Sequence, residues 1–345
     1  MVIKVQDTQL TSNKEGFDSP WDRQINNMYK IAIIENIHQD GIDLLKNHKD
    51  FDYEIIKDVS QQNLIKRLPE FDGCTLRVSK LDSKILSHCK KMKVISRHGV
   101  GFDNVDLDFI KENKISLLIT NTANAVAVAE HVMYMMLTLS KGITQYDKKV
   151  RTGNFKNNIT DIKTFELLNK EILIAGFGRT GKKLIKRCLG FDMTVKVFDP
   201  FLKKEDVDKF GGTKVDNFNE AVKTADYISI HMPLSDKTKN LINYNILKTM
   251  KKNSIIINTA RGGIINELDL DKALNDNLIF GAGLDVFEKE PINLDNPLIK
   301  NNKVLLSPHT ATFTKECTSR MSIETTKNII DFFEKTIDKS MFVKL

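Results

Sequence analysis

Short apolar runs alternate with amphipathic runs of helix length along most of this chain, and they do so in two successive series. In the first series we expect strands at residues 31–34, 51–56, 75–78, 94–96 and 115–120. A second series begins near Asn169, and its expected strands are residues 172–175, 195–198, 227–231, 254–258, 279–284 and 304–307. Strands separated by helices of this length pair in parallel, through right-handed crossovers. The pattern predicts an α/β fold with two doubly wound, parallel-sheet domains.

The segments between the strands carry helical periodicity. We expect helices at residues 41–48, 61–68, 83–90, 106–113, 182–189 and 314–335. One long, apolar-rich helix is expected at residues 124–142, between the two series. A length of 345 residues is more than one hydrophobic core usually serves, which agrees with two domains. Residues 1–28 are polar, lack periodicity and contain the only tryptophan, Trp21, so we expect an N-terminal extension there.

The overall composition is that of an ordinary soluble globular protein, with 41% hydrophobic and 28% charged residues. No apolar run approaches the roughly 18 to 20 residues that a membrane span requires. The longest candidate, residues 126–139, is interrupted by Glu130 and His131, which favours a buried helix. The N-terminus has no basic segment followed by an apolar one, so we expect no signal peptide.

The cysteines indicate the cellular compartment, and the distribution of charge indicates which partners the protein can bind. The four cysteines form no CxxC pair and are widely scattered, at Cys74, Cys89, Cys188 and Cys317. They favour reduced thiols in a cytoplasmic protein. The net charge of +7 comes from lysines spread over many segments, without a basic tract interleaved with aromatic residues. We therefore expect no nucleic-acid partner and no metal site, and a surface that attracts small anions.

The segment GFGRTG directly follows one of the expected strands and precedes an expected helix. In this context Gly176 permits a tight turn, Gly178 lets the backbone approach a pyrophosphate, and Gly181 allows close packing of helix and strand. Arg179 and Thr180 lie between the last two glycines, where their amides and the guanidinium can reach phosphate oxygens. The segment predicts a dinucleotide site at the N-terminus of the helix.

Asp199 follows Gly181 by 18 residues, at the end of the expected strand 195–198. A carboxylate there accepts hydrogen bonds from ribose hydroxyls and repels a 2′-phosphate, so it favours NAD over NADP. The alternative is that Asp199 and Pro200 only form a turn.

Three segments later in the chain supply the parts for chemistry on a 2-keto acid. Arg261 in NTARGG and His309 in LSPHTA each follow an expected strand, so both belong to the same sheet edge. The planar guanidinium can hold a carboxylate with two hydrogen bonds, and the imidazole can give a proton to the developing alkoxide. A carboxylate of DVFEKEP, Glu288 or Glu290, would fix the histidine tautomer and raise its pKa.

The chain resembles the D-isomer-specific 2-hydroxyacid dehydrogenase family, the group that includes phosphoglycerate dehydrogenase. The resemblance covers almost all of residues 29–335 and rests on ordered segments. These are SRHGVGFDNVD (96–106), NAVAVAEHV (124–132), GFGRTG with Asp199, HMPLSDKTKNLI (231–242), NTARGGIIN (258–266), GLDVFEKEP (283–291) and LSPHTA (306–311).

The resemblance implies a Rossmann nucleotide domain inserted in a flavodoxin-like substrate domain. The substrate domain would comprise residues 29–123 and 312–345, and the NAD-binding domain residues 124–311. The carboxylate of the family directly precedes a proline, which selects Glu290. A homodimer is also expected, because residues 126–139 are more apolar than one domain-facing stripe requires.

The resemblance further assigns contacts to individual residues. Besides the glycine loop and Asp199, it implies cofactor contacts for His231, Pro233, Thr238, Thr259, Ala260, Arg261, Asp285, His309 and Ala311. For the substrate, besides Arg261, it implies contacts with Arg77, Val78, Ser79, Gly99, Val100 and Gly101. The family often has Arg-Ser where this chain has Arg77-Val78, which weakens the assignment of that loop.

The sequence leaves the substrate open. Phosphoglycerate dehydrogenase is the nearest named activity, with Arg77, Arg97 and Lys80 as candidate phosphate partners. Glyoxylate or hydroxypyruvate reduction, the alternative, needs only the common carboxylate site. A branch of the family that oxidises another small anion, such as formate or phosphite, is a further alternative. From a different functional class, an NAD(H)-sensing protein like the transcriptional corepressors of this family also fits the sequence.

Overall fold

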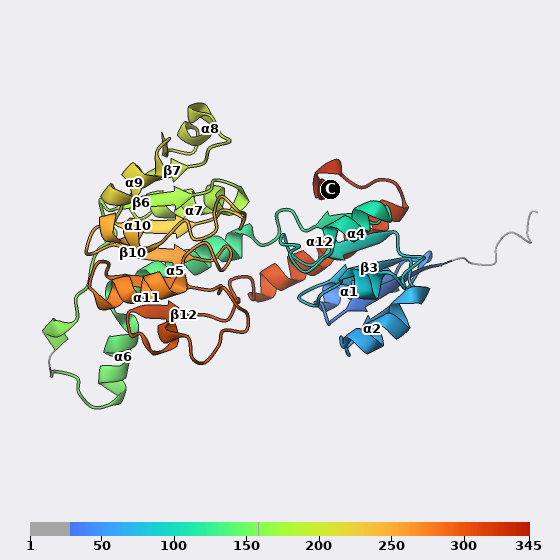
Figure 1. Cartoon of the computed structure of the whole chain (residues 1–345), viewed down its shortest axis with the longest axis horizontal. Helices are drawn as coiled ribbons and strands as arrows, with labels where there is room; N and C mark the ends of the chain where they lie inside the picture. Colours follow the sequence, from blue (N-terminus) through green and yellow to red (C-terminus); the bar gives the residue numbers. More distant parts are fainter. Residues whose placement is uncertain (1–27, 158) are drawn as a thin grey trace, which may run out of the picture.

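Two α/β units lie next to each other along the long axis of the molecule (Figure 1). The structure, a computed structural model, describes residues 28–157 and 159–345. The expected N-terminal extension, Trp21 included, lies outside the described residues except for Met28. Each unit contains one sheet, and all pairings between its strands are parallel. The prediction of two parallel-sheet α/β domains is confirmed.

The first unit, here called the five-stranded unit, has the strand order β2-β1-β3-β4-β5. Its strands are β1 (Tyr29–Ile34), β2 (Phe51–Ile56), β3 (Gly73–Leu76), β4 (Val94–Arg97) and β5 (Ser116–Ile119). Its helices are α1 (Gln39–Lys46), α2 (Gln61–Arg67), α3 (Ser83–Leu86), α4 (Leu107–Glu112) and the distant α12 (Lys315–Phe333).

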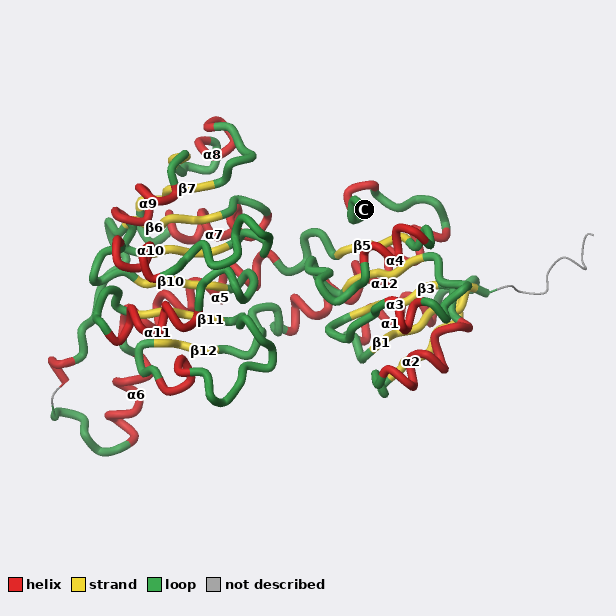
Figure 2. Tube along the Cα trace, in the orientation of Figure 1, coloured by secondary structure: helices red, strands yellow, loops and turns green. Residues whose placement is uncertain are grey.

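The second unit, the seven-stranded unit, has the strand order β12-β11-β10-β9-β6-β7-β8. Its strands are β6 (Glu171–Ala175), β7 (Thr194–Phe198), β8 (Thr213–Val215), β9 (Tyr227–Ile230), β10 (Ile255–Asn258), β11 (Gly281–Leu284) and β12 (Val304–Leu306). Its helices are α5 (Ala125–Lys141), α6 (Ile143–Arg151), α7 (Arg179–Leu189), α8 (Lys204–Asp208), α9 (Phe218–Thr224), α10 (Tyr244–Thr249) and α11 (Glu267–Asn275). Figure 2 shows its strands stacked between helices.

The chain passes between the two units twice. It enters the seven-stranded unit before α5 and returns to the five-stranded unit in α12, which packs on α1 and β4 (Figure 1). Ser96 donates its hydroxyl to the Thr325 carbonyl at 2.8 Å, and the Asn328 amide donates to the Ile119 carbonyl at 3.1 Å. The last helix therefore belongs to the first sheet. The domain limits at residues 123/124 and 311/312 stay a prediction.

The direction of winding reverses at β6. From β6 the chain first adds β7 and β8 on one side, and then β9, β10, β11 and β12 on the other. Helices cover both faces, so the strands are apolar and buried on both sides. Ile172, Leu173, Ile174 and Ala175 of β6, for example, are fully buried. At such a reversal the loops after neighbouring strands separate and leave a crevice at their carboxyl ends.

The sequence missed β8 and overextended α3. The three residues of β8 form the sheet edge and are at least partly exposed, which leaves little hydrophobic pattern to recognise. The helix expected at 83–90 ends at Leu86, because the chain then turns so that Cys89 and Met92 join the buried core. The long helix expected at 124–142 is α5, which Gly142 ends in a left-handed conformation with φ 58°.

Some negative features concern only residues 28–157 and 159–345. None of the helices in this part of the chain has the length and the apolar composition needed to cross a bilayer. The same residues contain no group of three histidine, cysteine or acidic side chains placed to hold a metal ion. The cysteines Cys74, Cys89, Cys188 and Cys317 are all free and buried.

Candidate active site

A cavity of about 510 Å³ opens at the carboxyl edge of the seven-stranded sheet, facing the five-stranded unit. It brings together three parts of the chain that the sequence had singled out separately. These are the glycine loop with Gly178, Arg179, Thr180 and Gly181, the strand ends with His231, Pro233, Thr259, Ala260 and Arg261, and Val100 and Gly101 of the five-stranded unit.

Glycine is needed at the three positions of GFGRTG for different structural reasons. A Cβ on Gly176, which has φ +95°, would lie 2.7 Å from the backbone of His231, and one on Gly181 would lie 2.7 Å from the Gly176 carbonyl oxygen. A Cβ on Gly178 would meet nothing within 4 Å. The first and third glycines are therefore required by packing. The second leaves open space at the N-terminus of α7, where an anion can approach the backbone.

Asp199 connects the end of β7 to the glycine loop. One carboxylate oxygen accepts the Phe177 N–H at 2.9 Å, and the other accepts the Phe201 N–H at 3.0 Å. Asp199 therefore shapes the turn, as one interpretation of the sequence expects. It can also bind a ribose, as the other interpretation expects, because each carboxylate oxygen keeps a further lone pair for a hydroxyl donor.

Arg261 follows β10 and points across the cavity. Its Nη1 donates to the Ala260 carbonyl at 2.7 Å, and its Nε donates to Asp103 of the five-stranded unit at 2.9 Å. The turn is folded by the buried Asn258, whose amide donates to the Arg261 carbonyl at 2.8 Å and accepts the Ala260 N–H at 3.0 Å. Sequence reasoning missed Asn258 and Asp103, although both lie within quoted segments.

His309 and Glu290 form a hydrogen-bonded pair. His309 Nδ1 lies 2.7 Å from a carboxylate oxygen of Glu290, whose other oxygen accepts the Phe287 N–H at 3.0 Å. The hydrogen bond to Glu290 raises the pKa of His309, against the opposing effect of burial. Burial acts to raise the pKa of Glu290, but the hydrogen bonds from His309 and Phe287 outweigh it, so that this pKa is lowered. Glu288 instead points toward the Glu267 backbone, at 3.4 Å.

A buried carboxylate holds the loop that carries the imidazole. Asp285 is fully buried, and its two oxygens accept the Ser307 hydroxyl at 2.6 Å, the Thr310 N–H at 2.8 Å and the Ala311 N–H at 3.0 Å. His131 on α5 lies 3.0 Å from the same Ser307 hydroxyl. Burial lowers the pKa of His131, against the opposing effect of the charge of Asp285. The carboxylate of Asp285 is thus already used as an acceptor by three donors of the protein.

The loop after β9 contributes shape rather than acid–base chemistry. His231 lies 2.8 Å from the Ser229 hydroxyl, and burial lowers its pKa to about 4. This imidazole is therefore neutral at neutral pH. Thr238 donates its hydroxyl to the Pro233 carbonyl at 2.7 Å and accepts the Ser235 N–H at 2.8 Å. These bonds close the loop over one side of the cavity. Several predicted site residues do not line the cavity themselves: Gly176, Asp199, Thr238, Asp285, Glu290, His309 and Ala311.

On the five-stranded side, the loop after β3 does not line the cavity. The Val78 and Ser79 amides donate to the Glu35 carboxylate, at 2.8 and 3.4 Å. Arg77 donates to the Asn36 carbonyl at 2.8 Å. Groups that the sequence assigned to the substrate are thus engaged within the five-stranded unit.

The loop after β4 does reach the cavity, through Val100 and Gly101. Gly99 precedes them with φ +146°, a conformation that favours glycine. Arg97 beneath the loop donates to the Gly101 carbonyl at 2.6 Å, to the Leu76 carbonyl at 2.7 Å and to the Arg77 carbonyl. Burial, followed by the charge of Arg261, lowers the pKa of Arg97 to about 10. Its guanidinium mainly supports the loop.

Comparison with known proteins identifies the family. The sequence profile described as D-isomer specific 2-hydroxyacid dehydrogenase, NAD binding domain, matches residues 133–311, more than half of the chain. The chain belongs to this family. It therefore contains an NAD-binding domain, and the Rossmann-type glycine loop lies within the matched residues.

Individual relatives differ in how much of their length is matched. D-3-phosphoglycerate dehydrogenase of Methanocaldococcus jannaschii is 34% identical over 290 residues, which are 84% of this chain and 54% of the relative. Glyoxylate reductase of Thermococcus litoralis is 33% identical over 326 residues, which are 91% of this chain and 97% of the relative. The chain thus spans about half the length of the phosphoglycerate dehydrogenase and almost the whole glyoxylate reductase.

Solved structures agree with the fold. D-lactate dehydrogenase from Aquifex aeolicus, complexed with NAD and lactic acid, has a TM-score of 0.79 and 27% identity. The match covers 91% of this chain and 98% of that one. NAD-dependent formate dehydrogenase from Staphylococcus aureus, in complex with NAD, has a TM-score of 0.81 and 26% identity, and the match covers 92% of this chain and 99% of that one.

Proposed function

We propose that the protein is an NAD-dependent D-2-hydroxyacid dehydrogenase acting at C2 of a small 2-hydroxy or 2-keto acid. The observation that carries the proposal is the 2.7 Å pair of His309 and Glu290. The pair lies at the sheet edge where Arg261 follows β10, close enough for the charge of Arg261 to act on both groups. A proton donor, its orienting carboxylate and a guanidinium beside a dinucleotide site are the parts that this reaction requires.

The residues fit the cofactor at two points. The open space at Gly178 and the α7 N-terminus suits the pyrophosphate. The contact of Asp199 with the glycine loop supports a role for its carboxylate in binding the adenine ribose hydroxyls. When bound, the nicotinamide supplies or accepts the hydride at C2 of the substrate. We assign the loop formed by Pro233 and Thr238, and the backbone of Thr259 and Ala260, to enclosing the dinucleotide.

The protein side of the reaction rests on Arg261, His309 and Glu290. Arg261 would bind the substrate carboxylate through its planar guanidinium, which orients C2 in the cavity. His309 Nδ1 faces Glu290, so Nε2 is the nitrogen left to protonate the keto oxygen during reduction. Glu290 would keep the Nδ1 proton in place and stabilise the imidazolium before proton transfer.

The sequence suggests 3-phosphoglycerate as one substrate, and we retain it as the first candidate. Glyoxylate or hydroxypyruvate is the second, and a specific observation favours it. Arg97 is occupied by backbone carbonyls, and Arg77 donates to the Asn36 carbonyl. Lys80 is largely exposed and lies 3.7 Å from Asp82. These three were the expected phosphate partners, and none of them lines the cavity.

Initial rates with purified protein test both the proposed reaction and the identity of the substrate. NADH oxidation is followed with glyoxylate, hydroxypyruvate and phosphohydroxypyruvate, and NAD reduction with 3-phosphoglycerate. Turnover of any 2-keto acid supports a dehydrogenase, and the highest kcat/KM identifies the substrate class. Lys80→Ala should change kcat/KM only for a phosphorylated substrate. NADH binding without turnover of any of these acids, or of formate, would support the sensing alternative instead.

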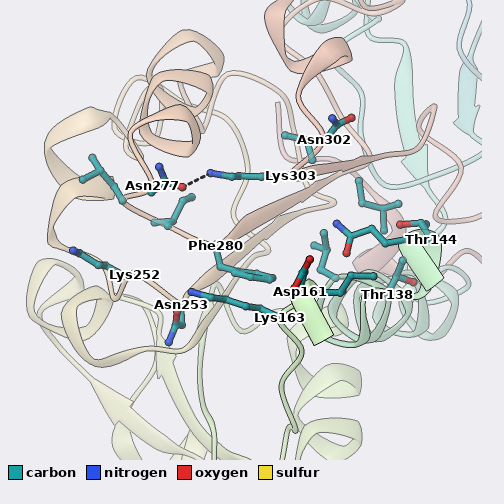
Figure 3. Close-up of a pocket in the computed structure, with 18 of the residues that line it drawn as sticks. Thr138, Thr144, Asp161, Lys163, Lys252, Asn253, Asn277, Phe280, Asn302 and Lys303 are labelled. Carbon is teal, nitrogen blue, oxygen red and sulfur yellow. Dashed lines mark hydrogen bonds between the residues drawn. The ribbon is translucent and has the colours of Figure 1, made fainter. Parts of the chain in front are cut away.

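The apolar residues on which the sequence prediction of a homodimer rested do not need a partner, because Val132, Met133, Met135 and Met136 of α5 are buried within one chain. We propose a homodimer on another surface, in which a second copy covers α6 and the segment that follows it. None of the α6 side chains is buried, and the helix extends away from the body of the seven-stranded unit (Figure 1). Ile143, Val150, Phe155 and Ile159 are each more than two-fifths exposed along this arm. Between the arm and the amino edge of the sheet lies a cavity of about 830 Å³, with Lys163 and Phe280 in its wall (Figure 3).

An isologous pairing would bury these apolar side chains and part of this cavity. Light scattering at micromolar concentration measures the mass directly, and a monomer would contradict the proposal. For the compartment, we propose the cytoplasm, because all four cysteines are free and buried and no pair of them forms a disulfide.

A further inference from the structure

Asp103 of the five-stranded unit makes a direct contact with the substrate-binding residue of the seven-stranded unit. Its Oδ2 accepts the Arg261 Nε–H at 2.9 Å. Asp103 follows β4 in the loop that contains Gly101, whereas Arg261 follows β10. The bond therefore joins two loops from different sheets, at the place where both line the cavity.

The contacts of Arg261 leave one Nη1 N–H and the two Nη2 N–H groups for a ligand. Nε donates to Asp103 and Nη1 to the Ala260 carbonyl, while Nη2 lies against Gly101. A Cβ on Gly101 would be only 1.5 Å from Nη2, so any larger residue there would displace the guanidinium. Gly101 is thus required by the position of Arg261, and Asp103 holds the side chain against it.

The negative charge of Asp103 also offsets the repulsion between the guanidinium groups of Arg97 and Arg261. Arg97 and Arg261 are close enough that each repels the other's charge, which contributes to the lowered pKa of Arg97, while Asp103 and Glu35 act in the opposite direction. Arg97 cannot move away, because three backbone carbonyls hold its guanidinium. Without the carboxylate of Asp103, the repulsion would act on Arg261 unopposed, and only the Nη1 bond to the Ala260 carbonyl would hold the guanidinium.

We propose that Asp103 is a positioning residue that aligns Arg261 for the substrate carboxylate. The inference rests on the proposed function and adds a condition to it. Because the two residues belong to different units, the guanidinium takes this orientation only when the units are close together. Substrate binding is thereby coupled to the approach of the five-stranded unit.

Kinetics of Asp103→Asn test the role, with Asp108→Asn as the matched control. Asp108 is an exposed acid on α4 of the same unit, outside the cavity. We expect the keto-acid KM of Asp103→Asn to rise roughly five- to ten-fold, the effect of a charge-assisted hydrogen bond reduced by solvent exposure. kcat should fall less than KM rises, the NADH KM should stay within about two-fold, and Asp103→Glu should recover part of the loss.

Two further measurements decide between positioning and a general structural role. In an Arg261→Gln background, Asp103→Asn should have no additional effect on KM, whereas a structural role would add its loss in both backgrounds. A crystal structure of Asp103→Asn should show the Arg261 guanidinium moved away from Gly101. An unmoved guanidinium, or an unchanged keto-acid KM, would overturn the inference. If the wild-type protein turns over no keto acid, the proposed function fails, and the crystal structure still decides the role of Asp103.

Discussion

The two units meet at one cavity but contribute to it in different ways. The seven-stranded unit presents Arg261 to the cavity after β10, while Asp285 after β11 and His309 shortly after β12 lie at the same sheet edge outside the cavity lining. The five-stranded unit presents loop backbone at Val100 and Gly101 and the counter-charge of Asp103, while Arg97 and Glu35 are used within the unit itself. We infer that the seven-stranded unit carries the proton donor and the substrate-binding guanidinium, and that the five-stranded unit contributes backbone and the carboxylate that holds this guanidinium.

The difference has a structural cause. Parallel strands end at a common edge, so residues far apart in sequence reach one place without any long-range side-chain contact. The loops of the five-stranded unit have to be held in shape instead. Their polar groups are therefore consumed by bonds such as those from Val78 and Ser79 to Glu35. Mutations in the two units should accordingly differ in which kinetic constant they change.

The largest expected effect comes from removing His309, the proposed proton donor of the seven-stranded unit. His309→Ala should lower kcat by roughly 100- to 10,000-fold, the usual loss when general acid–base catalysis is removed. NADH affinity, measured by fluorescence titration, should change little. The control is His88→Ala, an exposed histidine of the five-stranded unit that should leave kcat unchanged. A fall of less than ten-fold for His309→Ala would remove the chemistry from this unit.

A pair of glycine variants sharpens the comparison within the seven-stranded unit. Gly178→Ala adds a methyl group in open space, so the melting temperature should hardly change while the Kd for NADH rises roughly ten-fold. Gly176→Ala places its Cβ 2.7 Å from the His231 backbone at φ +95°. It should cost about 1–3 kcal/mol of stability. Equal melting temperatures for the two variants would contradict the separation of packing and binding.

Asp199→Ala tests a smaller effect, the choice of cofactor. Loss of the carboxylate removes the repulsion of a 2′-phosphate and a hydrogen-bond acceptor for the ribose. The preference for NADH over NADPH, measured as a ratio of kcat/KM, should narrow by roughly ten-fold. Because Asp199 also accepts the Phe177 and Phe201 N–H groups, Asp199→Asn separates charge from turn shape. Equal wild-type efficiency with both cofactors would refute the assignment.

The smallest expected effect is a shift in pH dependence. Glu290 raises the pKa of His309. In the proposed mechanism, reduction requires the protonated imidazole. Glu290→Gln should therefore lower this pKa and move the alkaline limb of the reduction profile to lower pH, since the active form is depleted sooner as pH rises. Glu288→Gln is the matched control, because Glu288 points toward Glu267. An unshifted Glu290→Gln profile would mean that Glu290 does not raise the pKa of His309.

The sequence alone was sufficient for the architecture and for the residues at strand ends. Alternating strand and helix patterns determine a parallel sheet, and a parallel sheet determines which loops share an edge. The sequence pattern therefore predicts that Arg261, His309 and the glycine loop belong to one site. The choice of Glu290 over Glu288 needed the family resemblance. The two carboxylates lie two residues apart in a loop, where no helical or strand periodicity shows which of them faces the histidine.

Only the tertiary structure decided which polar groups are already engaged. Val78, Ser79, Arg77 and Arg97 have the right chemistry for an anion, yet their donors are used by Glu35, by the Asn36 carbonyl and by other backbone carbonyls. Asp103 became relevant because a loop of one sheet reaches Arg261 of the other. This last contact joins residues 158 positions apart, and no local pattern in the chain encodes the distance between them.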